Sequence, residues 1–274
     1  MAFAGTVGWI TGASSGIGAA LARALAGQGA HLVLSGRNRD ALAALATDLP
    51  TRTLIAPFEA TDHAAMRAAA DTAWDWACQH GGGIDMLINN AGISQRSLAV
   101  DTDYGVYERI IGVDLLAPIA LTQTLLPRMV ARGSGRIVMI SSVAGKVGVP
   151  MRTAYCAAKF GLIGYADALR AELCEAGLSV HVVAPGSVRT DVSRNALTAD
   201  GSARGISDRA IENGLDPAAT ASAILAALAA GEREIIIAEG FEAAIGEARR
   251  TPDALFDQIA KLASGYAQRM AQAE

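Results

Sequence analysis

Three side chains near the middle of the 274-residue sequence have the types and spacing needed for proton transfer. Ser142 is followed thirteen residues later by Tyr155, and Lys159 comes four residues after the tyrosine. Positions four apart share a helix face, and a cation about 4 Å from a phenolate stabilises it by roughly 4 kcal/mol at an effective dielectric near 20. Such a tyrosine could exchange a proton with a substrate oxygen held by the serine. A tyrosine–lysine pair alone is typical of an ordinary helix surface, so the other motifs of the sequence must decide whether this pair takes part in proton transfer.

A glycine-rich turn near the N-terminus, TGASSGIG, predicts a phosphate-binding site. Gly12, Gly16 and Gly18 permit a tight turn and close approach of a ligand, and the free N–H groups of a helix start favour an anion. The spacing G-x-x-x-G-x-G differs from the dinucleotide-binding pattern G-x-G-x-x-G, and by itself it is weak evidence for dinucleotide binding. Its place after the first strand of a strand–helix array indicates dinucleotide binding.

The end of the second strand predicts which dinucleotide binds. An acidic residue there would hold the ribose hydroxyls of NAD, but this sequence has Gly36 and Arg37. A guanidinium can bind a 2′-phosphate with two hydrogen bonds, and no carboxylate at this position repels it. NADP(H) is therefore expected, with NAD(H) less favoured. The alternative is a solvent-facing arginine at a helix start.

Alternating strand and helix patterns predict how these residues are positioned. We expect one domain over residues 1–274, an α/β fold with a doubly wound, Rossmann-type parallel sheet of about seven strands and helices on both faces. Strands are expected at 7–11, 31–35, 53–56, 86–88, 136–141, 179–184 and 234–238. Helices are expected at 16–28, 38–48, 62–79, 103–131, 152–175, 216–230 and 253–270. The polar stretch 191–214 is expected to be a substrate loop or lid.

Composition limits the classes of function. Hydrophobic residues make up 51% of the chain and its formal net charge is −4, so a large core is expected and no general attraction to nucleic acid or an anionic membrane. The three cysteines show no C-x-x-C spacing, which predicts neither a disulfide framework nor a metal site and favours the cytoplasm. No apolar run is expected to reach membrane-spanning length, because the nearest, 218–230, has about 13 residues and these are mostly small.

A hydrolase is the main rival interpretation. GASSG matches the G-x-S-x-G nucleophile elbow, and HGGG at 80–83 resembles an oxyanion loop. The elbow would follow the first strand, which is too early for that fold, and HGGG should precede it. We therefore expect both matches to be coincidental.

Taken together, TGASSGIG, NNAG, Ser142, YCAAK and PGSVRT resemble the short-chain dehydrogenase/reductase family over roughly residues 5–191. The run 141–173 is similar to the dehydrogenase/reductase member 7 branch. The resemblance implies hydride transfer between a nicotinamide cofactor and a carbonyl or secondary alcohol. Tyr155 would be the general acid/base, Lys159 would assist it and bind the nicotinamide ribose, and Ser142 would hold the substrate oxygen.

The same resemblance implies the residues that contact the dinucleotide. They are Gly12, Ser14, Ser15, Gly16, Ile17, Gly18, Arg37, Glu59, Ala60, Asn90, Ala91, Gly92, Tyr155, Lys159 and, at the nicotinamide end, Pro185, Gly186, Val188 and Thr190. It also implies a homodimer or homotetramer built on helices 103–131 and 152–175. Apolar residues in the 191–214 loop suggest an apolar small-molecule substrate.

Two positions depart from the family pattern. Asp114 stands where the family usually has an asparagine, whose main-chain carbonyl holds a water that relays protons toward the lysine. A buried carboxylate there would take up a proton or pair with Lys159. Glu59 replaces an aspartate beside the adenine and can still accept its hydrogen bond. Asp114 leaves open a second function, a catalytically impaired dinucleotide-binding or redox-sensing module.

Overall fold

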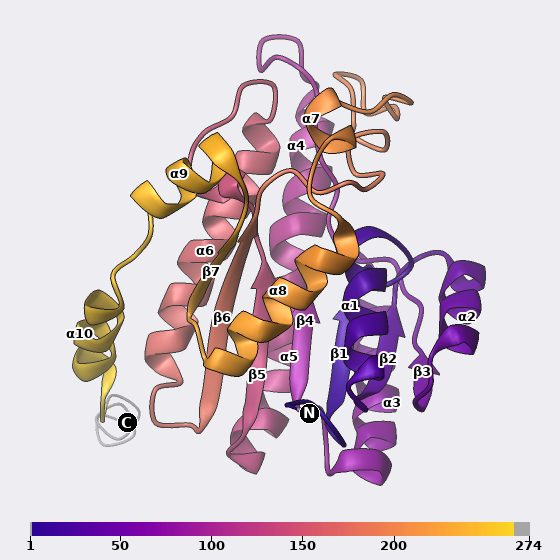
Figure 1. Ribbon diagram of the computed structural model, residues 1–274, viewed down its shortest axis with the longest axis vertical. Coiled ribbons are helices and arrows are strands. Elements are labelled where there is room, and N and C mark those ends of the chain that lie inside the picture. Colours follow the sequence, from indigo (N-terminus) through magenta and orange to yellow (C-terminus); the bar gives the residue numbers. More distant parts are fainter. Residues whose placement is uncertain (1, 266–274) are drawn as a thin grey trace.

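A seven-stranded, fully parallel β-sheet forms the centre of the protein, for which the computed structural model describes residues 2–265 (Figure 1). The strand order is β3-β2-β1-β4-β5-β6-β7. The strands are β1 Val7–Thr11, β2 His31–Ser35, β3 Thr53–Ile55, β4 Met86–Asn89, β5 Gly135–Ile140, β6 Leu178–Pro185 and β7 Glu234–Ile237. The chain begins in the middle and winds outward twice, so the predicted doubly wound α/β fold is confirmed.

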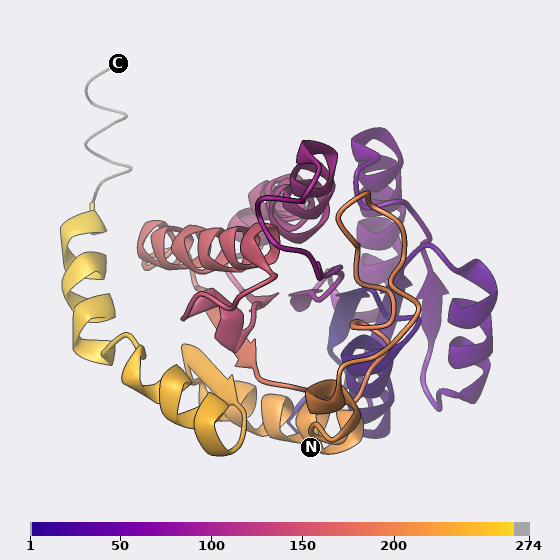
Figure 2. The same ribbon diagram turned by 90° about the horizontal axis from the view of Figure 1, so that it is seen from above.

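Helices cover both faces of the sheet (Figure 2). They are α1 Gly16–Gly27, α2 Arg39–Asp48, α3 His63–Gly81, α4 Tyr104–Ile111, α5 Ala117–Arg132, α6 Thr153–Glu172, α7 Arg209–Glu212, α8 Pro217–Ala230, α9 Gly240–Ala248 and α10 Asp253–Ala263. Two short segments, the π-helix η1 Gly112–Leu116 and the 3₁₀ helix η2 Val143–Gly145, complete the set.

Alternating strand residues feed two separate hydrophobic cores. On β1, Trp9 belongs to the core that includes residues of α3, α5 and α6, whereas Ile10 belongs to the core that includes residues of α1, α2 and α8. Successive side chains of a strand point to opposite faces, so a sheet covered on both sides needs apolar residues at nearly every position. This explains the continuous apolar runs from which the strands are predicted.

Four helical regions differ from expectation. The expected helix 103–131 is interrupted by the π-helical turn η1, which contains Asp114. Helices α7 and α9 were not expected, because each is short and lacks a sustained apolar period. The C-terminal helix α10 ends at Ala263 rather than at residue 270, and residues 266–270 of the expected range lie outside the described residues.

One expectation about membrane-spanning length is wrong. The continuous helical stretch Tyr104–Arg132 has 29 residues and a mean hydropathy of 1.6 in its most apolar window, enough to cross a bilayer by length and composition. Its side chains Leu121 and Leu125 are buried against the sheet, as in a core helix, so this is weak evidence for a span. The expected absence of membrane contact and the cytoplasmic location stay predictions.

Candidate functional site

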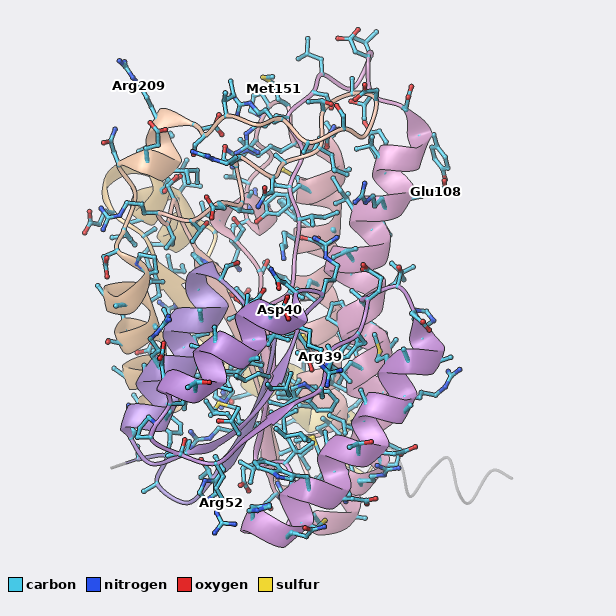
Figure 3. All side chains as sticks on the ribbon, turned by 90° about the vertical axis from the view of Figure 1, so that its right-hand side faces the viewer. Arg39, Asp40, Arg52, Glu108, Met151 and Arg209 are labelled. Atoms are coloured by element: carbon cyan, nitrogen blue, oxygen red, sulfur yellow. The ribbon has the colours of Figure 1, made fainter. Side chains whose placement is uncertain are left out.

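The predicted site residues lie where the parallel strands end. β1 and β2 run in register from Val7 opposite His31 to Thr11 opposite Ser35, which brings the glycine-rich turn and Arg37 to one edge. Figure 3 shows that Met151, in the loop before α6, lies at the same end of the molecule as Arg209 of the 191–214 loop. Arg52, just before β3, lies at the opposite end.

Lys159 is the central side chain of the predicted Ser–Tyr–Lys group. Its Nζ donates to the Ile140 carbonyl (3.1 Å), forms an ion pair with Asp114 Oδ2 (3.2 Å) and lies 5.5 Å from the centre of the Tyr155 ring. The lysine side chain is only 5% exposed. The i,i+4 spacing on α6 therefore does place the two side chains together, with the ammonium held from the sheet side.

Asp114 is fully buried and faces Lys159 from the π-helical turn. Its Oδ1 accepts a hydrogen bond from the Ile93 N–H (2.8 Å), and π turns inside helices often occur at functional sites. Gly92 makes room for the pair, since a Cβ there would lie 2.9 Å from Asp114 Oδ2 and 3.3 Å from Lys159 Nζ. The carboxylate therefore pairs with the lysine, one of the outcomes expected for this substitution.

Burial and pairing shift both pKa values upward. Burial raises the pKa of Asp114 above its ordinary value, and the Lys159 ammonium and the Ile93 N–H offset only part of this. Burial acts to lower the pKa of Lys159, but the attraction of Asp114 and of Tyr155 outweighs it, so the lysine pKa is raised. The raised pKa keeps Lys159 an ammonium at neutral pH, and its Nζ lies 3.2 Å from the Asp114 carboxyl group.

Ser142 caps the short helix η2 at the end of β5. Its Oγ accepts from the Ala144 N–H (3.1 Å) and donates weakly to the Pro185 carbonyl (3.4 Å). The preceding Ser141 donates to the Lys159 carbonyl (2.9 Å), which ties this strand end to α6. A hydrogen bond from the Ser141 side chain to the Lys159 backbone thus joins the segment of Ser142 to the helix of Tyr155 and Lys159.

The glycine-rich turn fits a dinucleotide phosphate. Ser15 is the N-cap of α1 but its side chain makes no cap hydrogen bond, and the first turn holds no acidic residue. At α2, α3 and α8 the cap residues Asn38, Asp62 and Asp216 do bond to the helix N–H groups. The first N–H groups of α1 are therefore left for an anion.

Close packing explains the glycines of this turn. Gly12 has a φ of +64°, and a Cβ there would lie 2.8 Å from the Ala91 Cα. A Cβ on Gly18 would overlap the Gly12 carbonyl oxygen. Asn90 holds the turn from the neighbouring strand end, because its Nδ2 donates to the carbonyls of Thr11 (2.9 Å) and Gly12 (3.2 Å).

The residues expected around the adenosine also meet at this edge. Arg37 Nη1 lies 3.8 Å from Glu59 Oε2, and both side chains are largely exposed. Glu59 also accepts from the Ala60 N–H (2.9 Å). A loose, exposed pair leaves most of the arginine's donors available, although the carboxylate lies close to where a 2′-phosphate would bind.

A cavity of about 920 Å³ opens beside the turn, between α1 and the segment before α8. Its lining includes Ser14, Ser15, Gly16 and Thr190 from the expected cofactor set. A smaller cavity of about 370 Å³, lined in part by Phe3 and Arg136, contains none of the expected site residues.

The 191–214 loop packs against Tyr155 of the predicted Ser–Tyr–Lys group. The Leu197 N–H donates to the Ser94 carbonyl and its own carbonyl accepts from the Arg96 N–H, both at 2.8 Å. Leu197 is buried in a small apolar cluster against which Tyr155 packs. The expected substrate loop therefore gives the tyrosine an apolar wall.

An arginine cluster that the sequence did not predict anchors this loop. Asp208 pairs with Arg96 (2.5 Å), Arg152 (3.5 Å) and Arg204. Burial works to raise the pKa of Asp208, but the guanidinium groups, chiefly Arg204 and then Arg96, hold it well below its usual range. Arg204 is partly buried in this cluster.

The loop after β6 carries the residues expected at the nicotinamide end. Val188 bridges to Leu215, and Thr190 packs against Gly16 of the glycine-rich turn, where a Cβ would lie 3.0 Å from the threonine methyl. The Gly186 N–H donates to the Ile237 carbonyl (3.0 Å). The Pro185–Thr190 segment thus runs from the end of β6 to the glycine-rich turn.

The hydrolase interpretation does not survive the geometry. His80, of HGGG, ends α3 and lies 3.2 Å from Arg52, at the end of the molecule opposite the site (Figure 3). Ser14 of GASSG lies in the glycine-rich turn, far from this histidine in the fold. Within residues 2–265 there is also no group of three His, Cys, Asp or Glu side chains that could hold a metal ion.

Comparisons with known proteins agree with this geometry. The family model for short chain dehydrogenases matches residues 6–201. Dehydrogenase/reductase SDR family member 7B of Danio rerio is 40% identical over 234 residues, which cover 84% of this chain and 76% of that protein. The expected member 7 branch is therefore confirmed.

Two solved structures share the fold. One is a short chain dehydrogenase/reductase from Burkholderia phymatum in complex with NAD, with a TM-score of 0.76, 23% identity, and coverage of 86% of this chain and 90% of that one. The other is a metagenomic short-chain oxidoreductase in complex with NADP, with a TM-score of 0.70, 29% identity, and coverage of 86% and 98%.

Proposed function

Because the chain belongs to the short-chain dehydrogenase family, we propose that it is an NADP(H)-dependent oxidoreductase acting on the carbonyl or secondary alcohol of an apolar small molecule. The observation that carries this proposal is the convergence of Lys159 Nζ and Tyr155 on α6, at the strand end that holds Ser142. Bound NADPH would supply the hydride that reduces the carbonyl carbon.

In this proposal the protein handles the proton. Tyr155 donates its hydroxyl proton to the carbonyl oxygen during reduction and takes it back as phenolate during oxidation. Lys159 stabilises that phenolate. Ser142 orients the same oxygen by a hydrogen bond, and Leu197, packed against the tyrosine, shields the site from water.

We further propose that Arg37 selects the phosphorylated cofactor. Its guanidinium is exposed at the end of β2 and only loosely paired with Glu59, which leaves donors for a 2′-phosphate. Arg37→Ala should raise the KM for NADPH by about tenfold to a hundredfold, because hydrogen bonds to a charged group contribute about 1.5–3 kcal/mol. The KM for NADH should stay within about twofold.

The measurement is the initial rate of cofactor oxidation with a panel of aldehydes and ketones, at varied NADPH and NADH. Arg52→Ala, at the opposite end of the molecule (Figure 3), is the matched control. Equal loss with both cofactors, or a wild-type preference for NADH, would contradict the role of Arg37.

A second function rests on Asp114, whose carboxylate lies 3.2 Å behind Lys159. If this charge stops proton transfer, the protein binds the dinucleotide without turning over substrate. NADPH binding without turnover by the wild type, together with turnover by Asp114→Asn, would favour this second function over the first.

We extend the proposal to assembly as a homodimer or homotetramer, as in the family. Leu116 in η1 is 49% exposed and Phe160 on α6 is 38% exposed, both on the helices expected to form the subunit contact. Large apolar side chains on such helices support a protein–protein interface.

A further inference from the structure

Helix α9 places one carboxylate against the loop after β6. Glu242 accepts two hydrogen bonds from Ser187, one from its backbone N–H to Oε2 (2.7 Å) and one from its hydroxyl to Oε1 (2.8 Å). A Cβ on Gly186 would overlap Glu242 Oε2, so the glycine lets the carboxylate reach the loop. Nothing about the spacing of these residues in the sequence indicates this contact.

The remaining polar group of Ser187 is also held. Its carbonyl accepts from the Leu215 N–H (2.9 Å), and Gly214 packs so closely that a Cβ there would lie 2.5 Å from the same oxygen. The loop is therefore fixed between α9 and the segment leading into α8, with Glu242 supplying both bonds on one side.

Helix α9 is itself anchored at its other end. Lys146 Nζ donates to the Arg249 carbonyl, just after α9 (3.2 Å), and pairs with the buried Glu234 of β7 (2.7 Å). Along the helix, Gly246 packs on Ile236, where a Cβ would lie 2.8 Å from the isoleucine methyl. Because Lys146 follows Ser142 by four residues, α9 links the serine segment to the Ser187 loop.

We propose that Glu242 is a positioning residue that holds the Gly186–Thr190 wall in place for the nicotinamide half of the dinucleotide, an inference that rests on the proposed function. In this role the carboxylate acts through Ser187 and not through contact with cofactor or substrate. It fixes the backbone of the segment in which Val188 bridges to Leu215 and Thr190 packs against Gly16 of the glycine-rich turn. Hydride transfer is sensitive to displacements of about 1 Å, so a loosened wall costs both nicotinamide affinity and the rate of transfer.

The test compares Glu242→Gln, which keeps the side-chain size but removes one acceptor oxygen, with Ser187→Ala, which removes one hydroxyl. Glu247→Gln is the matched control, because that carboxylate lies on the same helix and pairs with Arg250 at its exposed end. Calorimetry measures the binding of NADPH and of adenosine 2′,5′-bisphosphate, which lacks the nicotinamide half. Turnover is measured with NADPH and with NADPH deuterated at the transferred position.

Glu242→Gln should weaken NADPH binding about tenfold and lower kcat about tenfold, with a larger deuterium isotope effect, while bisphosphate binding stays within about twofold. Ser187→Ala should change NADPH binding, kcat and the isotope effect in the same direction but by less, and Glu247→Gln should change none of the three. The proposal would be overturned if Glu242→Gln weakened the binding of NADPH and of the bisphosphate equally, or weakened the binding of neither. If Glu242→Gln does not fold, unchanged NADPH binding and unchanged isotope effect in Ser187→Ala would overturn it.

Measurements on the wild-type protein distinguish a failure of this inference from a failure of the proposed function. Wild-type protein that neither binds NADPH nor turns over any carbonyl would overturn both. Wild-type turnover with a Glu242→Gln variant that behaves like the wild type would overturn only the role of Glu242.

Discussion

Lys146 and Lys159 are both buried, and each forms an ion pair with a buried carboxylate. Their partners are Glu234 and Asp114, at 2.7 Å and 3.2 Å. Lys159 has a neighbour that can react, the Tyr155 hydroxyl group, because Lys159 Nζ lies 5.5 Å from the centre of the Tyr155 ring. Its charge can therefore act on a proton that moves during the reaction.

The other pair holds backbone instead. Lys146 donates to the Arg249 carbonyl, and Glu234 accepts weakly from the Thr251 N–H (3.4 Å), which fixes the turn between α9 and α10. Glu234 Oε1 has no hydrogen-bond partner among the described residues. Both lysines are buried and paired with a carboxylate, so these two properties do not distinguish them. The difference is the neighbour of each ammonium, which is the Tyr155 ring for the candidate catalytic Lys159 and the Arg249 carbonyl for the structural Lys146.

Removing the ammonium at the site should give the largest effect. Lys159→Met leaves Asp114 buried without a cation, which costs about 3–5 kcal/mol of unfolding free energy and lowers kcat by about a thousandfold or more. Burial already raises the pKa of Asp114, so the folded variant holds a proton more tightly than the unfolded chain. Its stability therefore falls as pH rises, and urea unfolding should show a larger loss at pH 8 than at pH 5.

That pH dependence separates the lone carboxylate from simple loss of packing. Lys159→Arg, which keeps a cation at this position, is the control for charge. A Lys159→Met variant with wild-type turnover would show that Lys159, like Lys146, is structural.

The second largest effect is expected at the structural pair. Lys146→Met should cost about 3–5 kcal/mol in urea unfolding, because Glu234 is left buried and unpaired. The double variant Lys146→Met/Glu234→Met should recover most of that loss. Turnover of the folded single variant should fall less than tenfold, since neither residue touches Tyr155. A thousandfold loss of kcat would erase the proposed difference between the two pairs.

The smallest effect is expected from removing only the carboxylate at the site. Asp114→Asn keeps an oxygen for the Ile93 N–H but removes the negative charge that raises the pKa of Lys159. The ammonium then acts on Tyr155 without compensation and favours the phenolate. The acid limb of the kcat/KM profile for alcohol oxidation should move to lower pH by about one unit. A shift to higher pH would mean that Asp114 helps the tyrosine lose its proton.

Much of the fold and one half of the site could be predicted from the sequence. The strands are short apolar runs. Strands that follow each other along the chain are also neighbours in the sheet, except for β3 and β4, which β2 and β1 separate. The glycine-rich turn depends on backbone packing within a few residues, as at Gly12 and Gly18, so it leaves a local pattern. The pairing of Tyr155 with Lys159 follows from helix geometry alone.

The missed contacts are single side-chain contacts between distant segments. Arg96 and Asp208 are 112 positions apart, and Ser187 and Glu242 are 55 apart. No period or spacing encodes such pairs, and α9 is too short to show a helical pattern. The π turn that carries Asp114 was also unpredictable, because it lies inside a stretch with a good helical pattern.

The most direct test of the account is the Tyr155→Phe variant, which removes one oxygen and keeps the ring beside Lys159. We expect NADPH affinity within about twofold of the wild type by calorimetry. Single-turnover reduction of the best carbonyl substrate should be slower by about a hundredfold to ten-thousandfold, because the proton donor is gone. Single-turnover reduction at the wild-type rate by a variant that binds NADPH normally would contradict the claim that Tyr155 transfers the proton.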